Sequence, residues 1–379
     1  MTETVQPASE KLLTAKRIPG IDLAEAFAAL MVVIYHISLC SYKLFEDPTV
    51  STAITYFCRT ILVTCVPIFL MVNGFLLLRH ELNLKKHVVK TVRLFLLSLF
   101  WGVAPLQTQL MLDGSSLTPL EFIKTMMQYS GPTIHLWYMG ALVCIYLFFP
   151  LIKLVYDKDR RIFLFFLIFS FAVTFGNRVL NQINTIVLFL QGGYQGAEVR
   201  NNWFSIFNPY NAVHGYTFVY FCLGGLLPDM VDWLQKHFPA ERRRRLVLCA
   251  AVFAGAVVHA LWFLFLNYTT GGYYLCVVWY GYNTLSALVM TLCVVLLCLE
   301  YQGLHSVPCR LVRTVSEHTL GIYFLHMIIL LPLKVYMWAH LRWLCNLPGN
   351  ILVGAAVTAV CVLISMGIRK IPGIRYLLQ

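Results

Sequence analysis

Residues 21–41, IDLAEAFAALMVVIYHISLCS, decide the fold class because they form an apolar stretch long enough to cross a membrane. A transmembrane helix needs about 20 predominantly apolar residues. Asp22, Glu25 and His36 interrupt this stretch, and at about 100° per residue they lie within about 40° of one line. Ionisable groups are costly inside a membrane and persist there mainly for function. His36, near the far end of the stretch, is therefore the leading candidate for a catalytic residue.

Composition places the whole chain in the same class. Of its 379 residues, 59% are hydrophobic and 12% are charged, and the mean hydropathy is +0.72. These values exclude a soluble domain and predict an all-α polytopic membrane protein. Ten stretches are long enough to cross about 30 Å of hydrocarbon, and the fifth and sixth of them are short. They cover about residues 21–42, 54–78, 90–111, 134–156, 161–177, 210–228, 246–266, 273–299, 314–338 and 350–368.

The distribution of basic residues predicts the orientation of this bundle. With both termini in the cytoplasm, 22 of the 29 Lys and Arg residues fall in cytoplasmic segments, as the positive-inside rule requires. Topology and anionic lipid therefore account for the net charge of +12. The run Arg242–Arg245 follows the same rule and gives no reason to expect a nucleic-acid partner.

The termini, the cysteines and the absence of soluble-domain motifs indicate how many domains the chain has. Residues 1–20 are expected to be a cytoplasmic segment without a cleavable signal peptide. The 12 cysteines are scattered and form no CxxC pair, so neither a disulfide framework nor a metal site is indicated. No nucleotide-binding motif or long hydrophilic stretch is present. The chain is therefore predicted to be a single membrane domain over residues 1–379.

Two predicted outer loops are longer than the others, at about residues 112–133 and 178–209. Both combine turn-forming residues, aromatic rings and hydrogen-bonding side chains, including Gly192, Arg200 and Trp203. This composition suits the binding of sugar hydroxyls and ring faces, and it equally suits an ordinary loop that covers the bundle.

Several motifs follow one another in the order of a known family. The first are RIPGIDL at residues 17–23 with VVIYH at 32–36, VPIFLMVNG at 66–74, and KTVR at 90–93. HLWY at 135–138, PLI at 150–152 and SEHTLGIYFLH at 316–326 complete the series. Together they resemble the membrane acyltransferase-3 superfamily. The resemblance spans essentially the whole chain and is greatest to short, ten-helix members that act on enterobacterial common antigen or exopolysaccharides.

The resemblance implies transfer of an acyl group, most often acetyl, from cytosolic acyl-CoA to a hydroxyl of a cell-surface or lipid-linked glycan. Acyl-CoA would be a co-substrate, and no bound cofactor is expected. The location implied is the cytoplasmic membrane of a bacterium, with membrane lipid as a further partner. Two positions depart from the family pattern: Glu25 replaces the usual base eleven residues before His36, and Asn73 replaces the common Ser before Gly74.

Each candidate residue has a chemical interpretation. A neutral imidazole such as that of His36 can accept the proton of an attacking hydroxyl or can itself be acylated. Asp22 and Glu25 lie too far along the helix to touch His36, so they would face the donor's entry route or pair with a base. Asn73 is a further polar candidate in the second helix.

The remaining candidates each have an alternative explanation. Lys90 and Arg93, at positions i and i+3, could bind the phosphates of coenzyme A, although the positive-inside rule explains them as well. His135, Trp137 and Tyr138 begin the fourth helix where an aromatic belt is expected; the resemblance makes them candidates for positioning acceptor or acyl group. Glu317 and His326 are ionisable groups expected at membrane depth.

A second class of function stays open. A bundle with buried acids and histidines would also suit a transporter or flippase of polysaccharide or lipid-linked sugar, and Glu25 favours that alternative. The absence of paired, broken helices in the sequence argues against it.

Overall fold

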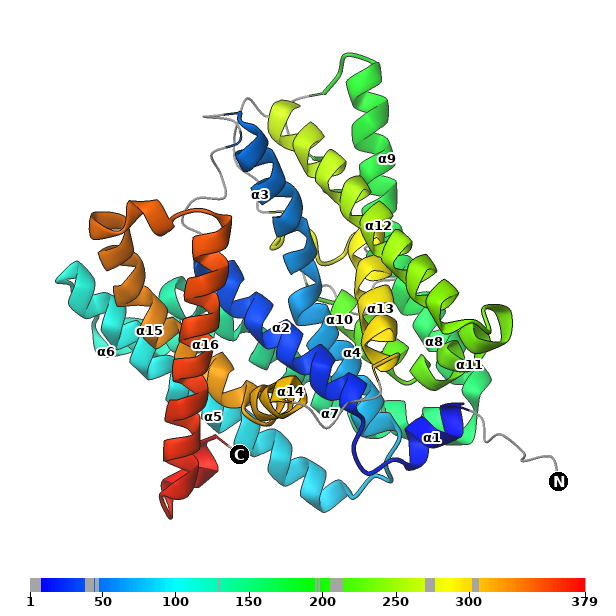
Figure 1. Cartoon of the computed structure of the whole chain (residues 1–379), viewed down its shortest axis with the longest axis horizontal. Helices are drawn as coiled ribbons and strands as arrows, with labels where there is room; N and C mark the ends of the chain where they lie inside the picture. The colour runs from blue at the N-terminus through cyan, green and yellow to red at the C-terminus, as the bar shows by residue number, and fades with distance from the viewer. Residues whose placement is uncertain are drawn as a thin grey trace. The chain divides into compact units, whose positions relative to one another are not determined.

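The computed structural model describes residues 8–37, 44, 48–128, 130–194, 196, 198–204, 214–269, 277–301 and 307–378. Every regular element in these ranges is a helix (Figure 1). Within them, eight helical segments are long and apolar enough to cross a membrane. The predicted all-α membrane architecture is therefore confirmed.

The chain divides into two compact units that alternate along the sequence. The first unit comprises Met1–Ala28, Tyr42–His80 and Val155–Cys309, and the second comprises Ala29–Ser41, Glu81–Leu154 and Arg310–Gln379. Helix α2 (Pro19–Ile37) contributes residues to both units. The prediction of one domain over residues 1–379 stays a prediction.

The second unit contains His36 and is built around α15 (Thr319–His340), which packs against α5 (Leu84–Asp113) and α16 (Leu347–Lys370). Trp101 of α5 stacks on Phe324 of α15 with ring centroids 5.7 Å apart. A Cβ atom at Gly354 of α16 would lie 2.6 Å from Ile34, so this glycine lets α2 approach closely. The other elements are α6 (Pro119–Gln128), η2 (Gly131–Leu136), α7 (Trp137–Lys158), α14 (Val307–Glu317), η4 (Arg342–Leu344) and η5 (Ile374–Leu377).

The first unit centres on α4 (Cys65–Leu78) and α10 (Tyr216–Gly224). A Cβ at Gly74 would lie 1.8 Å from the carbonyl oxygen of Phe221, and one at Gly224 would lie 2.0 Å from that of Met71. Two backbones therefore meet directly at these glycines, as small residues allow in membranes. The remaining elements are α1 (Ala8–Thr14), α3 (Val50–Thr60), η1 (Ile61–Thr64), α8 (Arg160–Phe171), η3 (Ala172–Gly176), α9 (Asn177–Leu190), α11 (Leu227–His237), α12 (Glu241–Thr269) and α13 (Leu285–Leu299).

Four predicted spans differ from the observed helices. The span predicted at 161–177 continues through η3 and α9 to Leu190. Of the span predicted at 210–228, α10 covers only Tyr216–Gly224, and part of the rest lies outside the described residues. The span at 273–299 is helical from Leu285, and residues 270–276 are not described. The span at 314–338 is divided at His318 between α14 and α15.

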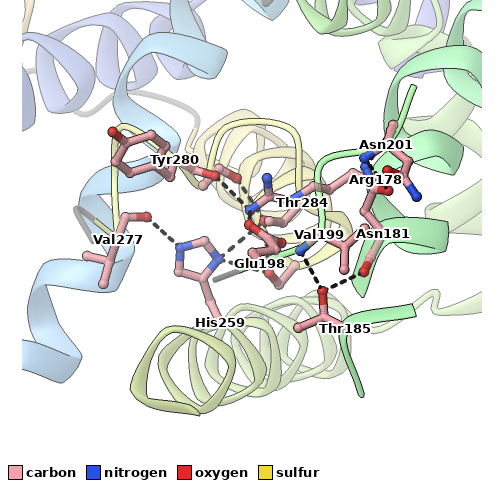
Figure 2. A network of polar contacts seen from close by, with 12 residues as sticks. Arg178, Asn181, Thr185, Glu198, Val199, Asn201, His259, Val277, Tyr280 and Thr284 are labelled. Carbon is pink, nitrogen blue, oxygen red and sulfur yellow. Dashed lines mark hydrogen bonds and ion pairs between the residues drawn. The ribbon is translucent and has the colours of Figure 1, made fainter. Parts of the chain in front are cut away.

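Helix α9 was missed because polar residues interrupt its apolar pattern. The structure shows that these residues face inward and bind the segment that follows the helix (Figure 2). Asn181 accepts from the backbone N–H of Asn201 at 3.1 Å, and Thr185 accepts from that of Val199 at 3.0 Å. Arg178 forms a buried ion pair with Glu198 at 2.8 Å. Part of the outer loop expected at 178–209 is therefore a helix with its own polar partners.

The same network reaches α12 and the start of α13. His259 of α12 contacts the carbonyl oxygen of Val277 at 2.8 Å and the hydroxyl of Ser286 at 2.9 Å. Thr284, which caps α13, lies 3.3 Å from the same imidazole (Figure 2). The other loop predicted as irregular, 112–133, likewise contains α6 and η2.

Candidate functional site

Three histidines from three separate segments meet in the second unit, and we call them the histidine cluster. His36 comes from α2, His135 from η2 and His326 from α15. The ring centroids of His36 and His326 are 5.2 Å apart, those of His135 and His326 are 5.5 Å apart, and those of His36 and His135 are 6.4 Å apart. The structure thus brings together three residues that the sequence singled out separately.

The hydrogen bond of His326 fixes which of its nitrogens can act as a base. Nδ1 lies 3.0 Å from the carbonyl oxygen of Ile322 one turn earlier. Because a carbonyl only accepts, Nδ1 carries the hydrogen, and Nε2 of the neutral ring keeps its lone pair. Nε2 is buried and has no hydrogen-bond partner among the described residues. His326 therefore offers a proton acceptor within the cluster.

His135 is held by the helix that carries His326. The hydroxyl of Tyr323 on α15 donates a hydrogen bond to the backbone carbonyl of His135, and the rings of these residues are 6.1 Å apart. The ring of Tyr138 lies 5.6 Å from that of Tyr323. Tyr323 was not among the predicted site residues, although it lies three positions before His326. Trp137 begins α7 and is half-buried.

His36 is half-buried near the C-terminal end of α2, with its ring 4.8 Å from that of Tyr35. The next residue, Ile37, is fully buried and fixes this end of the helix. The ammonium group of Lys334 on α15 lies within range of a charge–charge interaction with His36. Sequence reasoning missed Lys334, and the available signal was a lone lysine within an apolar span.

Three predicted residues belong to the first unit. Asp22 forms an ion pair with Arg17 at 2.7 Å, one of the pairings that the sequence suggested. Glu25 is half-buried on α2, about 16 Å along the helix axis from His36. The side-chain amide of Asn73 donates to the carbonyl of Phe69 in its own helix at 2.9 Å. The structure does not group these residues with the histidine cluster.

Lys90 and Arg93 lie on α5 and have different partners. The ammonium of Lys90 is 5.2 Å from the ring centroid of Tyr146. Arg93 donates to the backbone carbonyl of Tyr376, in the C-terminal segment that Trp101 also binds through the carbonyl of Leu377 at 2.9 Å. The guanidinium of Arg93 therefore binds a backbone carbonyl of the protein and does not form, together with Lys90, a free site for phosphate.

Glu317 lies just outside the apolar helix that carries His326. It is the last residue of α14, precedes the span that begins at Thr319, and is exposed. Its carboxylate pairs with Arg313 one turn earlier at 2.9 Å. The predicted ninth helix is divided at His318, so Glu317 precedes the apolar segment, and its position at membrane depth stays a prediction.

One comparison with known proteins identifies the family of the chain. The family model described as Acyltransferase domain matches residues 18–369, a range that includes all three members of the histidine cluster. The chain belongs to this family. No curated protein and no solved structure gives a match. With its apolar helices, the protein is thus a multi-pass membrane acyltransferase.

Among the residues that the structure describes, no group of three His, Cys, Asp or Glu side chains is arranged to hold a metal ion. What the cluster offers is imidazole nitrogen, which can accept a proton or attack a carbonyl carbon.

Proposed function

We propose that this acyltransferase moves an acyl group, acetyl in the first instance, from cytosolic acyl-CoA to a hydroxyl of a cell-surface or lipid-linked glycan. The observation that supports it best is the histidine cluster, which gathers three imidazoles in a protein of the acyltransferase family. The proposed location is the cytoplasmic membrane of a bacterium, with both termini in the cytoplasm.

The reaction needs a base near the acyl carbon. The acceptor oxygen attacks the thioester carbonyl, a C–O bond forms, and the C–S bond of the thioester breaks. The hydroxyl proton passes to an imidazole and then to the departing thiolate, so the products are an ester and free coenzyme A. General base catalysis of this kind contributes about 10²–10⁴-fold to rate.

We assign the central role to His36, as acceptor of the hydroxyl proton or as an intermediate acyl carrier. His326 would assist through its Nε2, which is buried without a hydrogen-bond partner among the described residues, in a ring whose centroid is 5.2 Å from that of His36. His135 and Tyr138 would position the acyl or acceptor group, since both pack near Tyr323 beside the cluster.

The donor is proposed to approach along α5. Lys90 is exposed near the start of this helix, beside Lys85 and Lys86, and could bind a phosphate of coenzyme A. Arg93 would do so only if it released the carbonyl of Tyr376. We therefore expect Lys90 to contribute more than Arg93 to donor affinity.

The test measures binding of radiolabelled acetyl-CoA and release of free coenzyme A by purified protein in lipid nanodiscs, with a membrane extract supplying acceptor. His36→Ala should abolish release while donor binding stays near that of the wild type. Lys90→Ala should weaken binding, and Lys124→Ala, on the exposed face of α6, is the matched control.

Two results would contradict the proposal. One is wild-type protein that neither binds acetyl-CoA nor releases coenzyme A with any membrane extract. The other is full turnover by the His36→Ala variant. Transport assays with lipid-linked glycans would then test the alternative of a flippase.

A further inference from the structure

Lys334 lies on the same face of α15 as His326, the member of the histidine cluster that this helix carries. Tyr323, His326, Leu330 and Lys334 follow at intervals of three and four residues, so they lie within about 80° around the helix. Lys334 is about 12 Å beyond His326 along the axis. Side chains on a helix tilt toward its N-terminus, which directs a long lysine back toward His326. Its electrostatic interaction with His36 agrees with this placement.

The charge of Lys334 has no counter-ion among the described residues of the protein. Lys334 is half-buried, and its ammonium forms no hydrogen bond or ion pair with any residue that the structure describes. Four acidic residues occur in the second unit, Glu81, Asp113, Glu121 and Glu317, and all four are exposed. Asp113 accepts from Gln109, Glu121 accepts from Thr118, and Glu317 pairs with Arg313.

An unpaired cation within a membrane span is costly and is normally paired or functional. Along α2, the ionisable residues before His36 are Asp22 and Glu25, so that helix contributes no cation near the cluster. Lys334 is therefore a source of positive charge that the described part of the second unit places within electrostatic range of His36.

We infer that Lys334 is the anion-binding residue of the acyl-transfer site and that its counter-ion is a negative charge of the substrate. This inference rests on the proposed function. Two parts of the substrate could supply this negative charge, and both would bind the ammonium through an anionic oxygen. One is the oxyanion that develops on the thioester carbonyl oxygen when the acceptor oxygen adds and before the C–S bond breaks. The other is a distal carboxylate of a dicarboxylic acyl group such as succinyl.

Anion binding is tested without turnover by thermal unfolding of the purified protein with sodium succinate, and with sodium chloride at equal ionic strength. Succinate should raise the unfolding temperature of the wild type and of Lys334→Arg, and should have no such effect on Lys334→Met. Lys370→Met, at the exposed end of α16, is the matched control and should respond like the wild type. Equal stabilisation of Lys334→Met would overturn the inference.

The variant also reports whether Lys334 has a structural role. A lysine that held the fold by pairing would leave a less stable protein when replaced. If Lys334 is unpaired, the Lys334→Met variant should be at least as stable as the wild type in the absence of succinate. A lower unfolding temperature for Lys334→Met than for Lys334→Arg in chloride would contradict the inference.

Kinetics with two donors distinguish the sources of the charge. If Lys334 binds the oxyanion, Lys334→Met lowers kcat with acetyl-CoA by about 10²-fold at little change in KM. If it binds a distal carboxylate, the loss of kcat/KM is about tenfold or more greater for succinyl-CoA than for acetyl-CoA. Unchanged kinetics with both donors would overturn the inference, whereas an inactive wild type would overturn the proposed function and leave the succinate result to decide.

Discussion

At the scale of single residues, one backbone hydrogen bond sets the tautomer of His326 in the histidine cluster. The bond from Nδ1 of His326 to the carbonyl of Ile322 leaves Nε2 as the basic nitrogen. An imidazole without this bond would exchange between tautomers and would present a donor at Nε2 part of the time. The sequence identified the histidine, but only the fold shows which nitrogen is available.

Replacing His326 by asparagine tests the roles of its two ring nitrogens separately. Asparagine can keep the donor that bonds to Ile322 but has nothing in place of Nε2, so His326→Asn should fold normally and lose about 10²–10⁴-fold in kcat. Coenzyme A release measures the loss, and size-exclusion chromatography with thermal unfolding checks the fold. Activity within about twofold of the wild type would show that Nε2 takes no part in the reaction.

Tyr323 is expected to act by positioning His135. Tyr323→Phe removes the hydroxyl that donates to the His135 carbonyl and should cost about 1 kcal/mol of stability. We also expect kcat to fall while KM for acetyl-CoA stays nearly constant, because the lost contact holds the cluster and not the donor. Tyr336→Phe, on an exposed part of the same helix, is the control and should change neither quantity.

At the scale of elements, α15 begins where His318 binds α16. Nδ1 of His318 lies 2.8 Å from the hydroxyl of Ser365. Burial of His318, together with the positive charge of Arg369, lowers the pKa of this imidazole, and Glu317 opposes the shift. The neutral form is therefore the one that the folded protein prefers at this junction.

This preference predicts a pH dependence of stability. Below about pH 6.5 the unfolded chain binds a proton at this histidine more readily than the folded protein does. Stability should therefore fall as pH drops from that value toward the lowered pKa, and it should be fully present at higher pH. Thermal unfolding between pH 5 and 8 measures the effect, and His318→Asn, which cannot titrate, should show a smaller fall. An equal fall in both proteins would assign the effect to other groups.

Element boundaries were predictable where apolar residues run without interruption, as in α12 and α16. They were not predictable where polar side chains find partners within the fold. Arg178 and Asn181 read as loop residues in the sequence, yet Glu198 and Asn201 satisfy them beside the helix. The partners lie in a segment 20 residues away along the chain, and a local pattern contains no information about that pairing.

At the scale of the whole molecule, the class of protein followed from composition alone, and the family followed from the order of motifs. The meeting of His36, His135 and His326 did not, because it depends on how α2, η2 and α15 pack. The sequence also could not show that Lys334 lacks an ion-pair partner among the described residues, because that depends on which side chains the fold places around it.

The intact protein is predicted to lie in the membrane with its C-terminus in the cytoplasm. A green fluorescent protein fused to the C-terminus should fluoresce, and alkaline phosphatase at the same position should be inactive, because the basic segments 242–245 and 369–375 should stay in the cytoplasm. An active phosphatase fusion would reverse the topology and with it the side from which donor and acceptor approach.

The π-helical turn η3 (Ala172–Gly176) sets the rotational phase of everything that follows it in α9. Its wider turn holds an extra residue, which shifts the later side chains by about 100° relative to a continuous α-helix. In the observed phase Arg178, Asn181 and Thr185 are buried, while Ile183 and Leu190 face outward. A deletion of one residue in this turn would rotate those faces by about 100°, turn the guanidinium of Arg178 away from Glu198 and release residues 198–203 from the helix. The five residues of η3 thus decide which side of α9 carries the buried polar side chains.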